Sequence, residues 1–344
     1  MQNPKHILVI RFSSMGDVAM TVPVLKNVLD QNPDLKITIV SNAFFEPLFS
    51  GLERCYFHPA YLKERHKGFG GMYRLFKELT NLYKFDAVID LHSVLRSHLL
   101  SLFFKMSRLS IATLDKGRRE KKALTRQQQK IFIPLTSMHE RYASVFRKIG
   151  ISVQLDADKS IYFKQEIPIA LRAIFSSGKK IIGVAPFAQF KEKMYPIEKM
   201  KILVGQLTEA NYTVLLFGGG KQESDVLEHW EKDIFSAFNV SSKYSFNEEL
   251  SIISNLDRMV SMDSANMHLA SLFKVPVVSI WGATHPYAGF NGWGQSDKNS
   301  VQLELSCRPC SVFGNKHCYR GDHACMQFIS EEMIFQKIVL GLNG

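Results

Sequence analysis

Residues 256–286 constrain the fold of this chain more than any other stretch, because they read as strand, helix and strand in immediate succession. An apolar run at 258–262 predicts a buried strand, helical spacing at 265–273 predicts a helix, and a second apolar run at 277–281 predicts another strand. A strand that reaches a parallel neighbour through a helix forms a βαβ unit. We therefore expect an α/β fold with a parallel sheet.

The turn between the first of these strands and the helix predicts an anion site. Asp263 or Ser264 can cap the helix, because a short side-chain oxygen satisfies one of its free N–H groups. The small residues Ser264 and Ala265 would let a diphosphate approach the backbone, and His268 could add a donor. A helix N-terminus attracts negative charge through its N–H groups and its dipole. The alternative is an ordinary βαβ unit with a capped helix and no ligand.

The same alternation of strands and helices runs through both halves of the 344-residue chain. Strands are expected at 6–12, 36–40 and 86–91 in the first half, and at 180–185 and 213–217 in the second. Each half should therefore form its own doubly wound, Rossmann-like domain, with the two domains facing across a cleft.

The polar, broken segment 151–168 is interpreted as the linker between these domains. The expected domains are residues 1–160 and residues 161–344. A terminal helix is expected at about 331–342, and it could pack back across the domains.

The net charge of +11 favours an acidic partner, which could be nucleic acid, an anionic membrane surface or a phosphorylated substrate. No nucleic-acid motif accompanies the charge, so we expect small anionic ligands and a membrane-embedded anionic acceptor. The apolar run at 7–10 stops at Arg11 and is too short for a signal peptide or a membrane span. We expect a monomer in the cytoplasm, which could bind peripherally to the cytoplasmic face of the inner membrane.

A polar turn directly follows the first predicted strand and ends at Asp17. A carboxylate at this position faces the crevice in which α/β sheets bind ligands, so Asp17 is a candidate general base. The alternative is that Asp17 only caps the next helix and needs no substrate.

Two motifs at opposite ends of the chain resemble the signatures of glycosyltransferase family 9, the heptosyltransferases of lipopolysaccharide core synthesis. The N-terminal pattern, basic-x-S-S-x-G-D, is matched by Arg11, Ser13, Ser14, Gly16 and Asp17. The C-terminal pattern is close to D-T-G-x-x-H-L-A followed by G-P-T-D-P. It is matched at Asp263, His268, Leu269, Ala270, Gly282, Thr284 and Pro286, with departures at Ser264, Ala265, Ala283 and His285.

This resemblance implies the GT-B architecture and an inverting transfer of heptose from ADP-heptose to a lipopolysaccharide core or related glycolipid acceptor. Asp17 would be the general base. Lys193, ahead of an aromatic–proline pair, would neutralise the diphosphate leaving group, with Lys191 as the alternative. No cofactor or metal is implied. The implied donor-binding residues are Ser13, Ser14, Gly16, Gly219, Glu223, Asp263, Ser264, Ala265 and His268.

Basic segments of the first half are candidates for acceptor binding, because Lys and Arg bind phosphates and carboxylates. The glycine-rich segment 61–74 is expected to be a mobile positive loop, and 115–130 is the most charged segment of the chain. The alternative for such a charge run is a solvated face. The apolar run 99–104 could contact a membrane surface or pack in the core. The acceptor candidates are Lys63, Arg65, Lys67, Arg96, Arg118 and Arg119.

Four cysteines cluster near the C-terminus, and C-x-x-C followed by Cys and His fits a structural zinc site. The competing prediction is free thiols without metal, which we favour because the resembled family shares C-x-P-C without an implied metal. The cluster consists of Cys307, Cys310, Cys318 and Cys325.

Three other functions stay open at this stage. A glycosyltransferase of this fold could use another nucleotide-sugar donor. A sugar-nucleotide epimerase shares the fold but lacks the S-S-x-G-D turn. A non-catalytic protein could bind sugar nucleotides or lipopolysaccharide, in which case Asp17 would be a helix cap alone.

Overall fold

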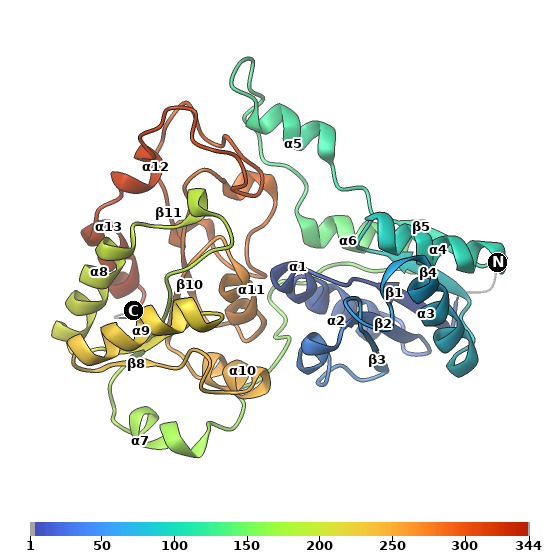
Figure 1. Ribbon diagram of the computed structural model, residues 1–344, viewed down its shortest axis with the longest axis horizontal. Coiled ribbons are helices and arrows are strands. Elements are labelled where there is room, and N and C mark those ends of the chain that lie inside the picture. The colour runs from blue at the N-terminus through green and yellow to red at the C-terminus, as the bar shows by residue number, and fades with distance from the viewer. Residues whose placement is uncertain (1–3, 343–344) are drawn as a thin grey trace. The chain divides into compact units, whose positions relative to one another are not determined.

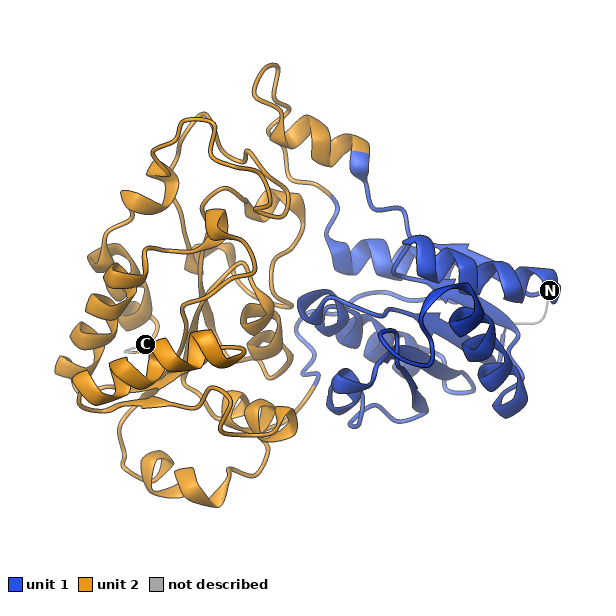
Figure 2. Cartoon of the chain, in the orientation of Figure 1, with its two compact units in different colours: residues 1–118, 136–161 blue, residues 119–135, 162–344 orange. Residues whose placement is uncertain are grey.

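The computed structural model describes residues 4–342 as two compact units, each built on its own parallel sheet (Figures 1 and 2). Unit 1 contains the described residues up to Arg118 together with Thr136–Ile161. Unit 2 contains Arg119–Leu135, here called the inserted segment, and the described residues from Tyr162 onward. The start of the second domain was expected at residue 161, next to this division, but the inserted segment was expected in the first domain.

The sheet of unit 1 has five parallel strands in the order β3-β2-β1-β4-β5. The central strand, β1, is buried on both faces, which explains why its sequence is a continuous apolar run instead of an alternation. The strands are β1 His6–Ile10, β2 Lys36–Asn42, β3 Cys55–Ala60, β4 Ala87–Asp90 and β5 Ser110–Thr113.

Helices cover both faces of this sheet, because right-handed crossovers that leave the sheet centre in opposite directions place their helices on opposite faces. Helices α3 and α4 pack together on one face over a core that includes Leu8, Ile10 and Val88, and α2 packs with α6. The elements are α1 Met15–Ala19, α2 Thr21–Gln31, the 3₁₀ helix η1 Ala43–Leu48, α3 Gly68–Leu82, α4 Leu95–Met106 and α6 Met138–Arg147.

The sheet of unit 2 has six parallel strands in the order β11-β10-β9-β6-β7-β8. Its central strands β6 and β9 are buried along their whole length. The strands are β6 Ile181–Ala185, β7 Thr213–Leu216, β8 Ala237–Asn239, β9 Arg258–Met262, β10 Val277–Ile280 and β11 Ser300–Val301.

Helices α8, α9 and α13 supply the apolar core on one face of this second sheet, and α13 packs on α8, β10 and β11 of the same unit. The helices are α5 Arg118–Thr125, α7 Arg172–Phe175, α8 Ile197–Glu209, α9 Lys221–Asp233, α10 Phe246–Ser254, α11 Ala265–Leu272, α12 Ala324–Gln327 and α13 Glu331–Leu340. Four 3₁₀ helices are η2 Ile169–Leu171, η3 Lys191–Lys193, η4 Pro286–Ala288 and η5 Asp297–Asn299.

Each sheet has one position at which the order of its strands reverses. In unit 1 the chain moves outward from β1 to β3 and then returns to β4, so the reversal lies between β1 and β4. In unit 2 it lies between β6 and β9. Ligands of open α/β sheets bind beyond the carboxyl ends of the strands at such a reversal, so these two edges are where a site is expected.

The predicted strands of both halves are confirmed, but four edge or short strands were not predicted: β3, β5, β8 and β11. Segment 61–74 was expected to be a loop, and this is wrong from Gly68 onward, because α3 begins there. Its glycines read as helix breakers, yet Gly71 is needed for packing: a Cβ there would lie 2.2 Å from the backbone carbonyl carbon of His66.

Within residues 4–342, none of the helices combines the length and the apolar character that crossing a membrane requires.

Candidate functional site

In unit 1 the candidate residues lie at the carboxyl edge of β1. Asp17 stands in the first turn of α1, and its Oδ2 lies 2.6 Å from Nη2 of Arg11. The same oxygen accepts a hydrogen bond from Oγ of Ser14 at 2.8 Å. The Asp17 side chain keeps 27% of its surface exposed, so these two contacts orient a carboxylate that solvent or a ligand can still reach.

Arg11 is almost fully buried beneath this carboxylate. Its Nη1 donates to the carbonyl oxygen of Leu91 at 2.7 Å, and its guanidinium carbon lies 5.8 Å from the centre of the Tyr142 ring. Burying a charge costs free energy unless the charge is paired. Asp17 and the Leu91 carbonyl together offset this cost for Arg11. Arg11 thus ties the loop after β1 to the end of β4.

His92 and Lys116 add polar groups to the same edge. Burial, followed by the charges of Arg11 and Lys116, lowers the pKa of His92 to about 3, so its ring is neutral near pH 7. Nδ1 of His92 accepts from the Phe12 amide at 3.4 Å, which places the ring proton on Nε2. Burial, followed by Arg11 and Arg118, lowers the pKa of Lys116.

Asp90, the last residue of β4, organises the loop that carries His92. It is fully buried and accepts hydrogen bonds from the amides of His92 at 2.9 Å and Ser93 at 2.8 Å. It also accepts from Oγ of Ser97, in the first turn of α4, at 2.9 Å. Asp90 therefore has a positioning role at the edge where Asp17 lies.

In unit 2 an ion pair spans the reversal of strand order. Nζ of Lys193, in η3 after β6, lies 3.0 Å from Oδ2 of Asp263, which directly follows β9. The two side chains are 15% and 8% exposed, so the pair is largely withdrawn from water. Lys191, the alternative candidate, is exposed.

The expected side-chain cap of α11 is wrong. Ser264 does occupy the N-cap position, but its side chain makes no cap hydrogen bond, and its Oγ lies 3.0 Å from Oγ of Ser261. Asp263 is drawn to Lys193 instead. The first N–H groups of α11, at Ala265 and beyond, are therefore left uncapped by these two side chains, which is the arrangement that suits an anionic ligand. His268 lies buried further along the same helix.

The loop after β10 carries the G-A-T part of the second motif, and Arg308 holds it in place. Nε of Arg308 donates to the carbonyl oxygen of Gly282 at 2.6 Å. Its Nη2 donates to the carbonyl oxygens of Trp281 at 3.0 Å and Thr284 at 3.1 Å. One buried guanidinium thus donates hydrogen bonds to three carbonyl oxygens of this loop.

His285 follows this loop and is buried against the inserted segment. The Phe132 ring centre lies 5.0 Å from the ring centre of His285, and Nδ1 of His285 accepts from the Tyr287 amide at 3.1 Å. Burial, followed by the charges of Arg308 and Lys130, lowers the pKa of His285 to about 4. The inserted segment therefore packs against the residue that follows this loop, through the contact of Phe132 with His285.

The glycine turn after β7 is closed by a carboxylate. Oε2 of Glu223 accepts a hydrogen bond from the Gly219 amide at 2.7 Å. Oγ of Ser241 donates to the carbonyl oxygen of Gly218 at 2.9 Å. Gly219 and Glu223, both expected to bind the donor, are thus brought together in unit 2.

The donor candidates are divided between the units: Ser13, Ser14 and Gly16 in unit 1, and the other six in unit 2.

The acceptor candidates are also divided between the units. Lys63, Arg65 and Lys67 are exposed in the segment before α3, and Arg65 pairs with Glu78 at 3.6 Å. Arg96, also exposed, lies in the first turn of α4. Arg118 ends the first stretch of unit 1, whereas Arg119 begins the inserted segment of unit 2; both side chains are exposed.

The five cysteines form no disulfide. Burial raises the pKa of Cys310, and it raises the pKa of Cys325 to about 11, which favours their thiol forms near pH 7. Over the part of the chain that the structure describes, no group of three or more His, Cys, Asp or Glu side chains is placed to hold a metal ion.

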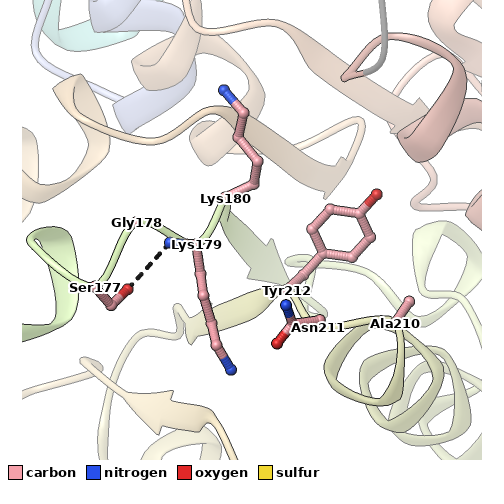
Figure 3. Close-up of a pocket in the computed structure, with 7 residues that line it drawn as sticks. All are labelled: Ser177, Gly178, Lys179, Lys180, Ala210, Asn211 and Tyr212. Atoms are coloured by element: carbon pink, nitrogen blue, oxygen red, sulfur yellow. Dashed lines mark hydrogen bonds between the residues drawn. The ribbon is translucent and has the colours of Figure 1, made fainter.

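A pocket of about 470 Å³ lies elsewhere in unit 2 (Figure 3). Its walls include Lys179 and Lys180, which precede β6, and Tyr212, which precedes β7. In a parallel sheet these positions form the amino edge, opposite the edge that carries Lys193 and Asp263. We therefore do not assign the candidate site to this pocket.

Two Rossmann-like units, each built on its own parallel sheet, have the architecture of the GT-B fold class, and solved structures agree with this fold. The glycosyl transferase family 9 protein from Veillonella parvula has a TM-score of 0.74 at 18% identity, covering 100% of this chain and 99% of that one. The E. coli heptosyltransferase WaaC with ADP has a TM-score of 0.69 at 18% identity, covering 98% and 99%.

The family description "Glycosyltransferase family 9 (heptosyltransferase)" matches residues 72–318, and the chain therefore belongs to glycosyltransferase family 9. This confirms the resemblance drawn from the two motifs. The lipopolysaccharide core heptosyltransferase OpsX from Haemophilus influenzae is 23% identical over 348 residues, covering 98% of each chain. Two proteins named lipooligosaccharide heptosyltransferase 2 from Campylobacter jejuni are 25% and 26% identical, and the match spans about half of their length, 52% and 53%.

Several residues of the candidate site were missed by the sequence analysis. Arg11 entered it only as a motif match, and neither Asp90 nor Arg308 was singled out. Asp90 could have been found, because an acidic residue that ends a buried strand lies at the ligand-binding edge. No signal in the sequence indicates that Arg308 reaches back to the loop after β10.

Gly314 is expected to be intolerant of a side chain. Its φ is +75°, and a Cβ there would lie 2.1 Å from Cγ of Lys193. Gly314→Ala should lower the free energy of unfolding by more than the ~1–2 kcal/mol that a left-handed alanine costs, because Lys193 must also move. Gly321→Ala is the matched control, with φ of +80° and nothing within 4 Å. Equal losses in urea unfolding of the two variants would contradict this prediction.

His285 should make the protein less stable as the pH falls. Its folded-state pKa of about 4 is below the unfolded value of 6.5, so between these values the unfolded chain binds a proton that the folded chain does not. The contribution is present above about pH 6.5 and is lost as the pH falls, at up to ~1.4 kcal/mol per pH unit.

The measurement is the free energy of unfolding near pH 7 and near pH 5. His285→Asn, which keeps an acceptor for the Tyr287 amide, should show a shallower pH dependence. His229→Asn changes an exposed histidine and serves as the control. A slope in His285→Asn equal to that of the wild type would show that His285 does not cause the pH dependence.

Proposed function

We propose that this protein transfers heptose from ADP-heptose to a lipopolysaccharide core or related glycolipid acceptor, with inversion at the anomeric carbon. The observation that carries the proposal is Asp17, oriented by Arg11 and Ser14 at the reversal of strand order in a chain of glycosyltransferase family 9. The names of the relatives support the heptose and the acceptor, since they are heptosyltransferases of lipopolysaccharide or lipooligosaccharide. The similar E. coli structure that contains ADP supports the nucleotide.

Asp17 acts in this proposal as the general base. Its carboxylate takes the proton of an acceptor hydroxyl as the oxygen attacks the anomeric carbon of the donor. The bond from that carbon to the phosphate oxygen breaks, and ADP leaves with its electron pair.

The departing diphosphate is met by positive groups of unit 2. Lys193 contacts Asp263, and Asp263 directly precedes Ser264, the N-cap residue of α11, at the carboxyl edge of β6 and β9. Such preorganised donors stabilise charge that develops in the transition state. Asp263 holds the lysine in place before the donor binds, and a phosphate would then compete with it for the ammonium group.

The acceptor is a glycolipid in this proposal, so the protein works at a membrane surface as a peripheral protein. The exposed basic residues Lys63, Arg65, Lys67 and Arg96 of unit 1 would attract its phosphate and carboxylate groups, and Arg118 and Arg119 would add to that attraction.

Asp17→Asn tests the base. The amide keeps the size of the side chain but cannot accept the proton, so turnover should fall roughly 10²–10⁴-fold. Folding and affinity for ADP should be unchanged, as measured by thermal unfolding and calorimetry. Asp34→Asn, at an exposed position, is the matched control and should keep full turnover. Turnover of Asp17→Asn near the wild-type value would rule out the assignment, and ADP binding without transfer by the wild type would indicate a binding protein.

Arg118→Ala with Arg119→Ala tests the acceptor role. Losing two exposed positive charges should raise the acceptor KM and weaken its dependence on salt, because salt screens this attraction. Donor affinity should barely change. The control removes two exposed lysines elsewhere, Lys84→Ala with Lys232→Ala. If the arginine variant lost donor affinity and kept its acceptor KM, these arginines would serve the donor instead.

A further inference from the structure

An apolar row runs along the solvent side of α4. Leu95, Leu99, Leu102 and Met106 follow one another at spacings of four, three and four residues, which places them on one face of a helix. Leu95 is 85% exposed, Leu102 50% and Met106 74%. The solvent face of a helix in a globular protein is normally polar, so this row calls for an explanation.

Helix α3 extends the row sideways. Phe69 is 67% exposed and Tyr73 is 49% exposed, one helical turn apart on α3. Both ring centres lie 5.5 Å from that of Phe103, which belongs to α4 and to the core of unit 1. Helices α3 and α4 lie side by side (Figure 1) and pack together. Their exposed apolar side chains are therefore considered as one surface. We call it the α3–α4 face; it consists of Phe69, Tyr73, Leu95, Leu99, Leu102 and Met106.

Basic side chains predominate around this face, although Glu64 in the segment before α3 is also exposed. Helix α4 contains no acidic residue, and its Arg96 and Lys105 are both exposed. The segment before α3 adds exposed basic side chains, and Glu78 of α3 is engaged by His66 at 3.1 Å. Apolar side chains flanked by Lys and Arg are the pattern of helices that lie in a membrane interface, with the cations against anionic headgroups.

The position of the face connects it to the proposed chemistry. Helices α3 and α4 follow strands β3 and β4, so their N-terminal turns leave the carboxyl edge of the sheet, the edge that carries Asp17. Nδ1 of His98, in α4, lies 3.4 Å from Oδ2 of Asp90 at the end of β4. A lipid surface that touches the start of α4 would therefore lie on the same side of unit 1 as the candidate base.

We propose that the α3–α4 face docks the protein on an anionic lipid bilayer, with its apolar side chains at the boundary between headgroups and acyl chains. Arg96 and Lys105, together with the basic segment before α3, bind the lipid phosphates. This inference rests on the proposed function, because the glycolipid acceptor proposed there would bring the protein to a membrane. The apolar run 99–104 then serves both of its predicted roles. Leu100 and Phe104 are fully buried in the core, whereas the exposed Leu102 would contact the lipid.

The test is sedimentation of the full chain with phosphatidylcholine vesicles, with and without phosphatidylglycerol. The wild type should bind the anionic vesicles, less at high salt and less to neutral ones. Leu95→Gln, Leu102→Gln and Met106→Gln together should weaken this binding by about tenfold or more, since they remove only apolar contact from exposed positions. Leu95→Gln alone, the most exposed of the three, provides a second variant with a smaller loss.

The matched control is Phe235→Gln with Phe328→Gln, which removes side chains that are 90% and 70% exposed on unit 2. This variant should bind vesicles like the wild type. Equal binding by the triple variant, or an equal loss in the control, would overturn the proposal. So would a wild-type dimer that the triple variant converts to monomer, because the face would then cover a second copy of the chain.

An activity assay separates this proposal from the proposed function. With an acceptor embedded in vesicles the triple variant should lose kcat/KM, whereas with a deacylated, soluble acceptor it should keep the wild-type value. Vesicle binding that depends on the face, without any heptose transfer, would remove the proposed function and leave the docking surface standing. Heptose transfer together with unchanged vesicle binding by the triple variant would support the proposed function and overturn the docking surface.

Discussion

The ion pair of Lys193 and Asp263 depends on the way a parallel sheet is wound. All strands of such a sheet deliver their carboxyl ends to one edge, and a reversal of strand order leaves two of those ends without a crossing helix between them. In unit 2 the two ends are those of β6 and β9, and each delivers one member of the pair. Because both side chains are largely buried, each needs the other, and a charged ligand can exchange for either partner.

Unit 1 also has an ion pair near its reversal of strand order, formed by Arg11 and Asp17. There Arg11 directly follows β1, and its partner Asp17 stands in the short helix α1. Asp90, at the end of β4, accepts hydrogen bonds from the backbone amides of His92 and Ser93. The more exposed member of the pair therefore carries opposite charge in the two units. In unit 1 it is the carboxylate of Asp17, and in unit 2 it is the ammonium group of Lys193. A base is needed where an acceptor loses a proton, and cations are needed where a diphosphate leaves.

The sequence was sufficient for the central strands and for helices α11 and α13, because continuous apolar runs and helical spacing indicate which residues are buried. It was insufficient for β3, whose residues Tyr56 and His58 lie in an edge strand, and for α3, whose glycines serve packing. Motif positions led to Asp17, Lys193 and Asp263, but the pairing of the last two is a long-range contact. Arg308 illustrates this limit, since the three carbonyl oxygens of the loop after β10 to which it donates lie more than twenty residues away in the sequence.

The inserted segment has a consequence for the order in which the protein can form during synthesis. Residues 119–135 leave the ribosome before the second sheet exists, yet their partners Tyr287 and Phe290 are made much later. Meanwhile unit 1 lacks α6 until residue 147 has emerged. The nascent chain must therefore carry this basic, apolar stretch without these partners until Phe290 has been made. Neither unit is encoded by one continuous piece of the gene. Any attempt to express a half alone should move this stretch with unit 2, for example by circular permutation.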